Sequence, residues 1–312
     1  MFRRKDVLGL RDWSKEEIAL VLDTAAAMKD ILGRDLKKVP ALRGRSVATL
    51  FYEPSTRTRA SFELAAKYMS ADTVSLNASA SSIAKGESLL DTIWTIEAMG
   101  VDVVVLRHPV PGTSLQIAEH TRMHVVNAGD GAHEHPTQAL LDMYTVRERL
   151  GRVEGLTLAI VGDISHSRVA RSNIWGWQKM GAKVRVVGPP TMIPVDIDKA
   201  GVQVYWDIEE GLRGADVIMG LRIQLEREAR GFFPSFAEYT SFYGLTRERI
   251  RSINPGALIL HPGPVNRGVE ITDEVLSSAN AAVNEQVTNG VAVRMALLYL
   301  LLGGGQGDGF AS

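Results

Sequence analysis

Residues 47–69, VATLFYEPSTRTRASFELAAKYM, place an apolar run directly before a polar turn and an amphipathic segment. The run Val47–Tyr52 has the apolar and aromatic residues typical of a buried strand. Beyond Ser55, apolar residues recur at helical spacing and share one face; they are Phe62, Ala65, Ala66 and Met69. A strand that leads straight into a helix is the repeating unit of an α/β fold.

Apolar runs and amphipathic segments continue to alternate along the rest of the chain. The further predicted strands are 73–76, 101–106, 125–127, 157–162, 183–187, 203–206, 217–221 and 258–260. A second amphipathic segment starts at Pro136, with Leu140, Met143, Val146 and Leu150 on one face. This alternation predicts an α/β protein of two domains, each a parallel sheet flanked by helices, with the active site in the cleft between them.

The domain boundary is expected near residue 150. The segment Arg147–Leu156 carries several charges and two glycines, and a new series of strands starts after it. We therefore predict a first domain over 1–150 and a second over 151–286. The apolar helix expected over 287–302 is predicted to fold back on the first domain, and the glycine-rich tail 303–312 to be disordered.

Composition excludes several classes of function. The 312 residues carry 35 Lys and Arg against 36 Asp and Glu, a net charge of −1, which argues against a nucleic-acid or acidic-membrane partner. The absence of cysteine from the sequence excludes disulfides, thiolate metal sites and a cysteine nucleophile. The N-terminus lacks the apolar core of a signal peptide, and the run 291–302 is too short to span a bilayer. We expect a cytoplasmic protein.

The turn Glu53–Arg59 has the character of a phosphate site. A helix that begins here offers unpaired backbone N–H groups and a partial positive charge. Ser55, Thr56 and Thr58 add hydroxyl groups, and the Arg57 guanidinium suits phosphate oxygens. The alternative is an ordinary helix cap followed by a solvated arginine. The sequence has neither a Walker-A motif nor G-x-G-x-x-G, so it gives little support for nucleotide binding.

Two further polar segments suit a carbonyl group. Arg107 follows the strand 101–106, and the glycine-rich loop 127–138 delivers His135 to a helix start with Gln138 one turn on. An arginine and a neutral histidine that converge on one carbonyl oxygen would stabilise the oxyanion formed on nucleophilic attack. Gln138 would suit an amide NH₂. One alternative is a capping or core role for His135. Another is a metal site of His133 and His135, although their spacing is not the helical i, i+4 spacing of the H-E-x-x-H zinc motif.

Three motifs in this order, Ser55–Arg59, Arg107-His-Pro and His135-Pro-Thr-Gln138, resemble the carbamoyl phosphate site of the aspartate/ornithine carbamoyltransferase family. The likeness extends over essentially the whole chain apart from the tail. It implies a carbamoyltransferase of pyrimidine biosynthesis that needs no cofactor and no metal. The implied carbamoyl phosphate ligands are Ser55, Thr56, Arg57 and Thr58 for the phosphate, Thr58, Arg107 and His135 for the carbonyl oxygen, and Gln138 for the carbamoyl nitrogen.

The segment Ser79–Glu87 resembles the loop that, in this family, completes the site of a neighbouring chain in a trimer. The implied contributors are Ser81 and Lys85, with Ser82 as a rival to Ser81. The alternative is an ordinary surface loop. The resemblance thus implies a homotrimer with shared sites, and it leaves open whether a regulatory chain or a dihydroorotase-like partner joins it.

The second substrate is expected to bind basic residues at the ends of other predicted strands. Arg168 lies near a helix start after the strand 157–162, and Arg222 with Gln224 follows the strand 217–221. The pattern resembles the aspartate-binding residues of the family. The alternative is that these arginines pair with Glu226 or Glu228 on the surface.

The segment His261-Pro-Gly263-Pro264 favours aspartate over ornithine as the acceptor. Ornithine enzymes of the family typically carry a cysteine here, and ornithine would need an acidic pocket. Gly263 and Pro264 are implied aspartate contacts, although some relatives have leucine at the position of Gly263. Residues 227–244 are expected to form a lid, and Glu53 and Arg227 are implied to form ion pairs in the closed state. The rival functions are another acceptor such as ornithine, a nicotinamide-dependent dehydrogenase, and a non-catalytic scaffold.

Overall fold

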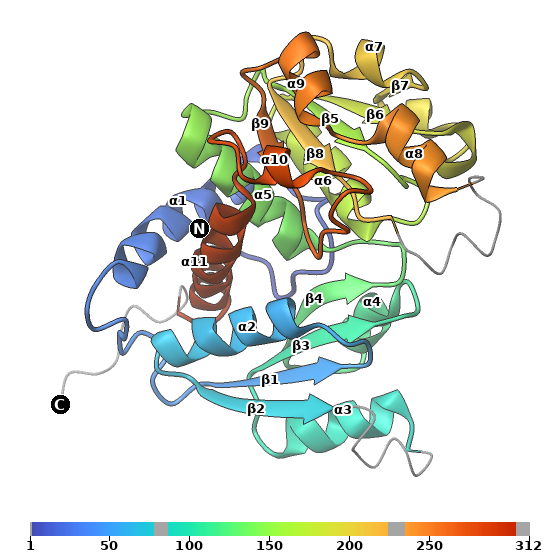
Figure 1. Ribbon diagram of the computed structural model, residues 1–312. Helices are drawn as coiled ribbons and strands as arrows, with labels where there is room; N and C mark the ends of the chain where they lie inside the picture. The colour runs from blue at the N-terminus through green and yellow to red at the C-terminus, as the bar shows by residue number, and fades with distance from the viewer. Residues whose placement is uncertain (1, 78–86, 224–234, 304–312) are drawn as a thin grey trace. The chain divides into compact units, whose positions relative to one another are not determined.

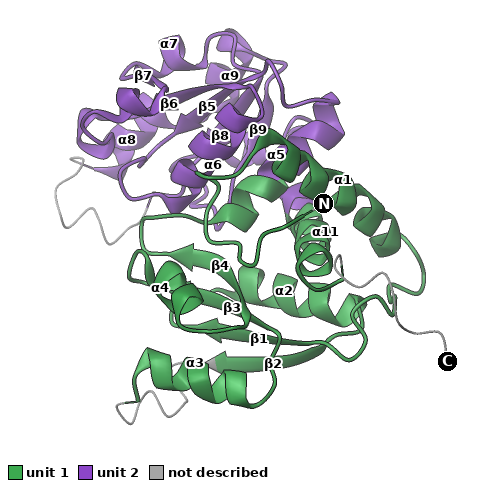
Figure 2. Cartoon of the chain, turned by 180° about the vertical axis from the view of Figure 1, so that it is seen from behind, with its two compact units in different colours: residues 1–141, 287–312 green, residues 142–286 purple. Residues whose placement is uncertain are grey.

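The computed structural model describes residues 2–77, 87–223 and 235–303 (Figure 1). The chain divides into two compact units, one of residues 1–141 and 287–312 and one of residues 142–286 (Figure 2). This division falls inside helix α5 (Pro136–Leu150), whereas the sequence places the boundary at 150/151. The tail predicted to be disordered lies, from residue 304 on, outside the described residues. Each unit is described by itself below.

Unit 1 is built on a four-stranded parallel sheet with the order β2-β1-β3-β4. Its strands are β1 (Ser46–Phe51), β2 (Asp72–Asn77), β3 (Val103–His108) and β4 (His124–Asp130). Its helices are α1 (Lys15–Leu32), α2 (Thr56–Tyr68), α3 (Leu89–Ala98), α4 (Thr113–Glu119) and α11 (Val283–Leu302) from Val287 on.

Helices cover both faces of the unit 1 sheet. Figure 1 shows α2 and α3 on opposite sides of it. On the α3 and α4 side, Leu50, Val104 and Ile117 belong to one buried cluster. On the other side, α2 and α11 are joined by a hydrogen bond from the buried Arg294 guanidinium to the Ser61 hydroxyl at 2.8 Å. The C-terminal helix is therefore part of the unit 1 core.

Unit 2 is built on a five-stranded parallel sheet with the order β7-β6-β5-β8-β9. Its strands are β5 (Thr157–Val161), β6 (Lys183–Val187), β7 (Gln203–Tyr205), β8 (Val217–Gly220) and β9 (Leu258–Leu260). Its helices are α5 from Asp142 on, α6 (Arg168–Lys179), α7 (Ile208–Leu212), α8 (Phe236–Tyr243), α9 (Arg247–Ile253) and α10 (Asp273–Leu276), with 3-10 turns η3 (Pro190–Met192) and η4 (Ile197–Ala200).

The unit 2 sheet is also covered on both sides. Helices α7 and α9 lie on one side and α6 on the other in both views (Figures 1 and 2). The α7 and α9 side encloses a buried cluster to which Ala159, Ile218 and Ile259 belong. The predicted fold class, two parallel sheets each flanked by helices, is confirmed. Among the described residues, no helix is long and apolar enough to cross a membrane.

The strand order creates a switch point in each sheet. In unit 1 the chain runs from β1 outward to β2 and then returns to place β3 on the other side of β1. In unit 2 the chain runs from β5 through β6 to β7 and returns to place β8 beside β5. Open parallel sheets bind ligands outside the carboxyl ends of the strands at such points. The ends of β1, β3, β5 and β8 are therefore the places to look for a site.

Candidate functional site

The phosphate-site candidates lie where β1 ends and α2 begins. Ser55 is the N-cap residue of α2, and its side chain makes no capping hydrogen bond to this helix. The first turn of α2 holds no acidic residue. Thr58 is buried on the inner face of this turn, while Arg57 is exposed. The helix therefore presents a positive end and a serine hydroxyl that is not used in capping, as an anion site needs.

The second arginine of this turn has a different role. The Arg59 guanidinium carbon lies 5.2 Å from the centre of the Phe51 ring, a distance at which a cation is attracted to an aromatic face. This contact turns Arg59 back toward the end of β1. Of the two arginines in the motif, Arg57 is therefore the one that suits a phosphate ligand.

Arg107 lies at an irregularity between β3 and β4. Leu106 pairs with Asn127 but His108 pairs with Asp130, so β4 has one residue more than β3 across this stretch. Such bulges redirect side chains and are common beside active sites. Arg107 Nε donates to Glu53 Oε2 at 3.0 Å, and its Nη1 donates to the Ala128 carbonyl oxygen at 3.4 Å.

The Arg107–Glu53 pair joins the ends of two adjacent strands. The Arg107 side chain is 15% exposed and that of Glu53 is 27% exposed, so water screens the pair only in part. The Tyr52 N–H also donates to the Arg107 carbonyl oxygen at 2.9 Å. Arg107 is therefore held against the turn that carries Ser55. The family resemblance implies that Glu53 and Arg227 form ion pairs in a closed state. Arg227 lies outside the described residues.

His108 helps to shape the turn after β3. Its Nδ1 accepts a hydrogen bond from the Val110 N–H at 3.1 Å. Its ring packs edge-on against the Tyr52 ring, with 4.7 Å between the two ring centres. Burial lowers the pKa of His108, and burial together with Glu87 raises the pKa of Tyr52 to about 12. Both groups are therefore neutral near pH 7.

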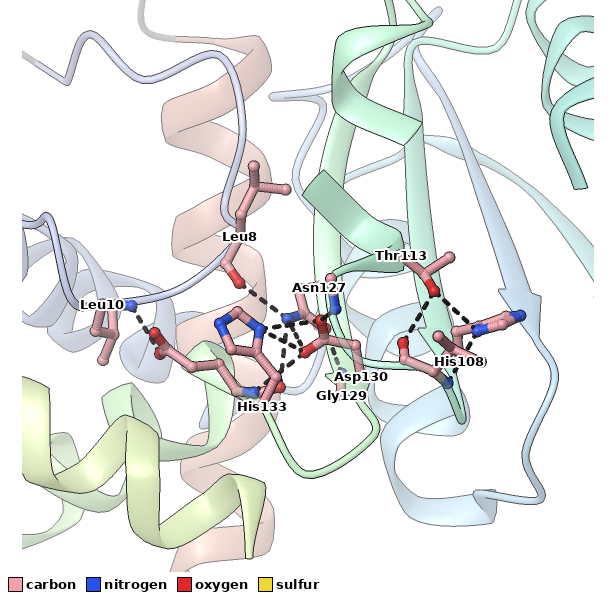
Figure 3. Close-up of polar contacts among 11 residues, drawn as sticks. Leu8, Leu10, His108, Thr113, Asn127, Gly129, Asp130 and His133 are labelled. Atoms are coloured by element: carbon pink, nitrogen blue, oxygen red, sulfur yellow. Dashed lines mark hydrogen bonds and ion pairs between the residues drawn. The ribbon is translucent and has the colours of Figure 1, made fainter. Parts of the chain in front are cut away.

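His135 is the last residue before α5, and only 4% of it is exposed. Its carbonyl oxygen accepts from the Gln138 N–H at 3.0 Å, which places the buried Gln138 on the first turn of the helix. The preceding loop is held by polar contacts around Asp130 (Figure 3). Burial acts to raise the pKa of Asp130, but hydrogen bonds from His133, Asn127 and the backbone outweigh it and lower that pKa.

His133 belongs to the loop contacts. Its Nδ1 lies 3.0 Å from Asp130 Oδ2. Over the described ranges, no three histidine, aspartate or glutamate side chains are grouped as a metal site would require. The carbonyl-site candidates Arg107 and His135 thus come from the ends of β3 and β4, beside the end of β1.

In unit 2, Arg168 is the first residue of α6 and is half-buried. Ser167 caps this helix by accepting from the Ala170 N–H at 3.1 Å. A Cβ atom at Gly162, where β5 ends, would lie 3.1 Å from Leu221 Cβ, and the φ of Gly162 is +130°. The segments after β5 and β8 therefore approach closely, which brings the regions of Arg168 and Arg222 to the same edge of the sheet.

The segment after β9 is fixed to the segment after β8. The Asn266 amide donates to the Ile223 carbonyl oxygen at 2.6 Å, next to the half-buried Arg222. The Asn266 N–H donates to Glu270 Oε1, also at 2.6 Å. These bonds hold the loop that contains Gly263 and Pro264 close to the chain around Arg222.

Gly263 has a conformation that explains its identity. Its φ is +62°, in the left-handed region that glycine adopts without steric cost. Its N–H donates to His261 Nδ1 at 2.8 Å, which closes a tight turn. The glycine in place of the leucine of some relatives therefore suits this turn.

The described residues contain only part of the predicted site. Ser81, Ser82, Lys85 and Gln224 lie outside them, as do residues 227–234 of the predicted lid. The remainder of the lid segment includes helix α8, where buried Tyr239 packs in one cluster with Met192 and Ile223. Sequence reasoning did not single out Asp130 or Asn266. The run of glycines around Asp130 was the available signal, because a polar residue in such a loop often fixes its shape.

Two family models match the chain. The aspartate/ornithine carbamoyltransferase carbamoyl-P binding domain matches residues 5–148, and the Asp/Orn binding domain of the same family matches residues 154–301. The aspartate carbamoyltransferase catalytic subunit of Moorella thermoacetica is 63% identical over 302 residues, which is 97% of this chain and 98% of that protein.

Solved structures give the same result. A crystal structure of aspartate transcarbamoylase from Trypanosoma cruzi in complex with N-(phosphonacetyl)-L-aspartic acid is 31% identical, covers 96% of this chain and 97% of that one, and has a TM-score of 0.87. Ornithine carbamoyltransferase from Pyrococcus furiosus is 28% identical, covers 96% and 98% of the two chains, and has a TM-score of 0.84. The chain belongs to the aspartate/ornithine carbamoyltransferase family.

Proposed function

We propose that this chain transfers the carbamoyl group of carbamoyl phosphate to the amino group of L-aspartate, giving N-carbamoyl-L-aspartate and phosphate for pyrimidine biosynthesis. The observation that carries this reaction is the placement of three segments at one edge of the unit 1 sheet. They are the positive end of α2 after β1, Arg107 after β3 and His135 after β4, and these strands are neighbours in the order β1-β3-β4. Such an edge suits a ligand with a phosphate and a carbonyl group.

In this proposal, residues 1–150 with helix 287–302 form the carbamoyl phosphate domain, and residues 151–286 form the aspartate domain. The phosphate binds to Ser55, Thr56, Arg57 and Thr58 at the start of α2. The carbonyl oxygen is held by Thr58, Arg107 and His135, and the carbamoyl NH₂ by the Gln138 side chain. Arg107 is a permanent cation, and its bonds to Glu53 and to the Ala128 carbonyl oxygen hold it at the end of β3.

The reaction needs no covalent enzyme intermediate. The uncharged amine of aspartate attacks the carbamoyl carbon and forms the C–N bond. Arg107, His135 and Thr58 stabilise the negative charge that develops on the carbonyl oxygen. The C–O bond to phosphate then breaks, the phosphate leaves toward Arg57 and Lys85, and it accepts the proton lost by the amine. The proposed catalytic residues are Arg57, Thr58, Lys85, Arg107 and His135.

Aspartate is proposed to bind through Arg168, Arg222 and Gln224, with the carbonyl oxygens around Gly263 and Pro264 accepting from its amine. Each hydrogen bond between an arginine and a substrate carboxylate contributes about 1.5–3 kcal/mol. The half-buried position of both arginines supports this, because partial removal from water strengthens an ion pair. The ammonium group of ornithine would meet the same positive charge and be repelled.

The active assembly is proposed to be a homotrimer in which Ser81 and Lys85 of one chain enter the site of the next. The motif Ser79–Glu87 supports it through its resemblance to the shared loop of the family. A cytoplasmic location fits a small-molecule reaction of this kind. A regulatory chain or a dihydroorotase partner would be an added component, which native mass measurement of the complex from its own cells would detect.

The assignment is tested by phosphate release from carbamoyl phosphate with aspartate and with ornithine in parallel. Aspartate should support turnover, and the kcat/KM with ornithine should be lower by about 10⁴-fold or more, because a mismatched buried charge is heavily penalised. Comparable kcat/KM values for the two acceptors would rule out the proposed specificity. Turnover with neither acceptor would rule out transfer to aspartate and favour the scaffold alternative.

A further inference from the structure

Asp130 is a buried carboxylate at the end of β4, five residues before His135, and it is 1% exposed. The groups that bond to its side chain come from the turn after β3, from β4 itself and from the loop after β4; Figure 3 shows Asn127 and His133 beside it. Its neighbours are the Gly112 N–H at 2.8 Å, the Asn127 amide at 2.8 Å, the His133 Nδ1 at 3.0 Å and the Glu134 N–H at 3.1 Å.

The contacts of Asp130 connect the two halves of the proposed carbonyl site. Gly112 closes the turn that starts after Arg107, and Glu134 directly precedes His135. A backbone bond from the Gly131 N–H to the His108 carbonyl oxygen at 2.9 Å runs beside the carboxylate. The position of Asp130 therefore controls how far the loop that carries His135 lies from the loop that carries Arg107.

The surroundings of Asp130 are suited to a carboxylate and not to an amide. Gly112 donates to Oδ2, while the Asn127 amide and Glu134 donate to Oδ1. A carboxylate accepts at both oxygens, whereas an asparagine amide has one oxygen and one NH₂ group. In either orientation, the NH₂ of an asparagine at position 130 would face a backbone N–H. One of the two loops would then have to move.

We propose that Asp130 is a positioning residue that sets the separation of Arg107 and His135, and thereby the stabilisation of the oxyanion. The inference rests on the proposed function, in which these two side chains hold the carbonyl oxygen. Asp130 touches neither substrate in this scheme. Its effect is expected on the chemical step, because both groups act on charge that develops only in the transition state.

The test is Asp130→Asn, with kcat and the inhibition constant of inorganic phosphate as the two readouts. We expect kcat to fall about 10–100-fold, since a misplacement on the order of 1 Å costs up to about 100-fold. The phosphate inhibition constant should stay within about threefold, because among the described residues the hydrogen bonds of the Asp130 side chain go to Gly112, Asn127, His133 and Glu134 and not to the start of α2. A kcat within about twofold of wild type would overturn the proposal, and so would an equal loss of phosphate binding.

The matched control is Asp102→Asn in the same unit. Asp102 directly precedes β3, at the amino ends of the strands and so away from the proposed site. Like Asp130 it accepts from a backbone N–H, here that of Ser46 at 2.8 Å, and it also accepts from the Arg45 guanidinium at 3.0 Å. This variant should lower the melting temperature and leave kcat within about twofold. If both variants lower kcat equally, loss of stability explains the effect and the positioning role is overturned.

The failure of the inference can be told apart from the failure of the proposed site. His135→Ala is measured beside Asp130→Asn. A low kcat in the first with a normal kcat in the second rejects the positioning role alone, whereas normal kcat values in both reject the proposed oxyanion site as well. If Asp130→Asn does not fold, Asn127→Ser removes one donor to the carboxylate. A fall in kcat of about 3–10-fold with unchanged phosphate inhibition supports the proposal, and an unchanged kcat overturns it.

Discussion

Replacement of His135 by alanine separates transition-state stabilisation from substrate binding. If the imidazole donates to the carbonyl oxygen, its bond strengthens as negative charge develops there. Loss of one such donor typically lowers kcat by about 10²–10³-fold, which corresponds to roughly 2.7–4 kcal/mol of activation free energy. We therefore expect His135→Ala to lower kcat by that factor and to raise the KM for carbamoyl phosphate by much less.

The structure indicates that this variant will fold. The start of α5 depends on the His135 carbonyl oxygen, which accepts from the Gln138 N–H at 3.0 Å and the Ala139 N–H at 3.4 Å. Alanine retains that carbonyl group. The Asp130 contacts that hold the loop also involve no atom of the imidazole at position 135. The loss of a buried side chain should cost about 1–3 kcal/mol of unfolding free energy, which leaves the protein folded at 25 °C.

The measurement is initial rates over a range of carbamoyl phosphate at saturating aspartate, with His124→Ala as the control. His124 is a half-buried histidine at the amino end of β4, and its Nδ1 contacts the Lys5 carbonyl oxygen. His124→Ala should retain wild-type kcat. An unchanged kcat in His135→Ala with only a higher KM would show that His135 binds the ground state and is not part of the oxyanion site.

Three more predictions concern stability and assembly. Arg294→Ala should lower the free energy of unfolding by about 2–3 kcal/mol in urea, because this buried arginine bonds to Ser61 and lies over the Phe62 ring at 5.0 Å; no change would contradict its place in the core. The pKa of Asp130 is lowered in the folded state, so its stabilisation should be complete above the unfolded pKa of about 3.9 and be lost as the pH falls below it. The stability gap between wild type and Asp130→Asn should shrink over that range in acid titrations, and a constant gap would contradict the assignment. Arg57→Ala and Lys85→Ala trimers should each be inactive, and mixing and reassembling them should recover about one quarter of wild-type activity. About six in eight of the reassembled trimers contain both variants, and each of these has one intact site of three. No recovery after confirmed reassembly would reject the shared site.

The strands were the most predictable part of the fold. Strands of a parallel sheet are buried on both faces, so they occur in the sequence as continuous apolar runs with clear ends. Strands β6 and β9 begin and end at the predicted residues. Short helices give no such signal. Helices α7 and α10 have five and four residues, and packing of Leu212 and Val275 in the unit 2 core stabilises them.

The sequence pattern differs most from the structure beside the proposed site. Strand β3 was predicted to end at Leu106 and β4 at Asn127, yet they continue to His108 and Asp130. Polar residues normally indicate a loop. Here the backbone pairing continues through the bulge because the polar side chains bond to one another and to the neighbouring turns. These long-range partners cannot be read from local sequence, and such local conflicts are expected where residues serve function.

The choice of the second substrate cannot follow from the fold. An ornithine carbamoyltransferase matches this chain over 96% of its length with a TM-score of 0.84, hardly below the 0.87 of an aspartate enzyme. In our proposal the carbamoyl phosphate residues belong to unit 1, and Arg168 and Arg222 lie at the β5/β8 switch point of unit 2. Discrimination between a carboxylate and an ammonium group therefore depends on a few charges at that edge. A change of acceptor would require new side chains after β5, β8 and β9, and it would leave the chemistry at the ends of β1, β3 and β4 unchanged.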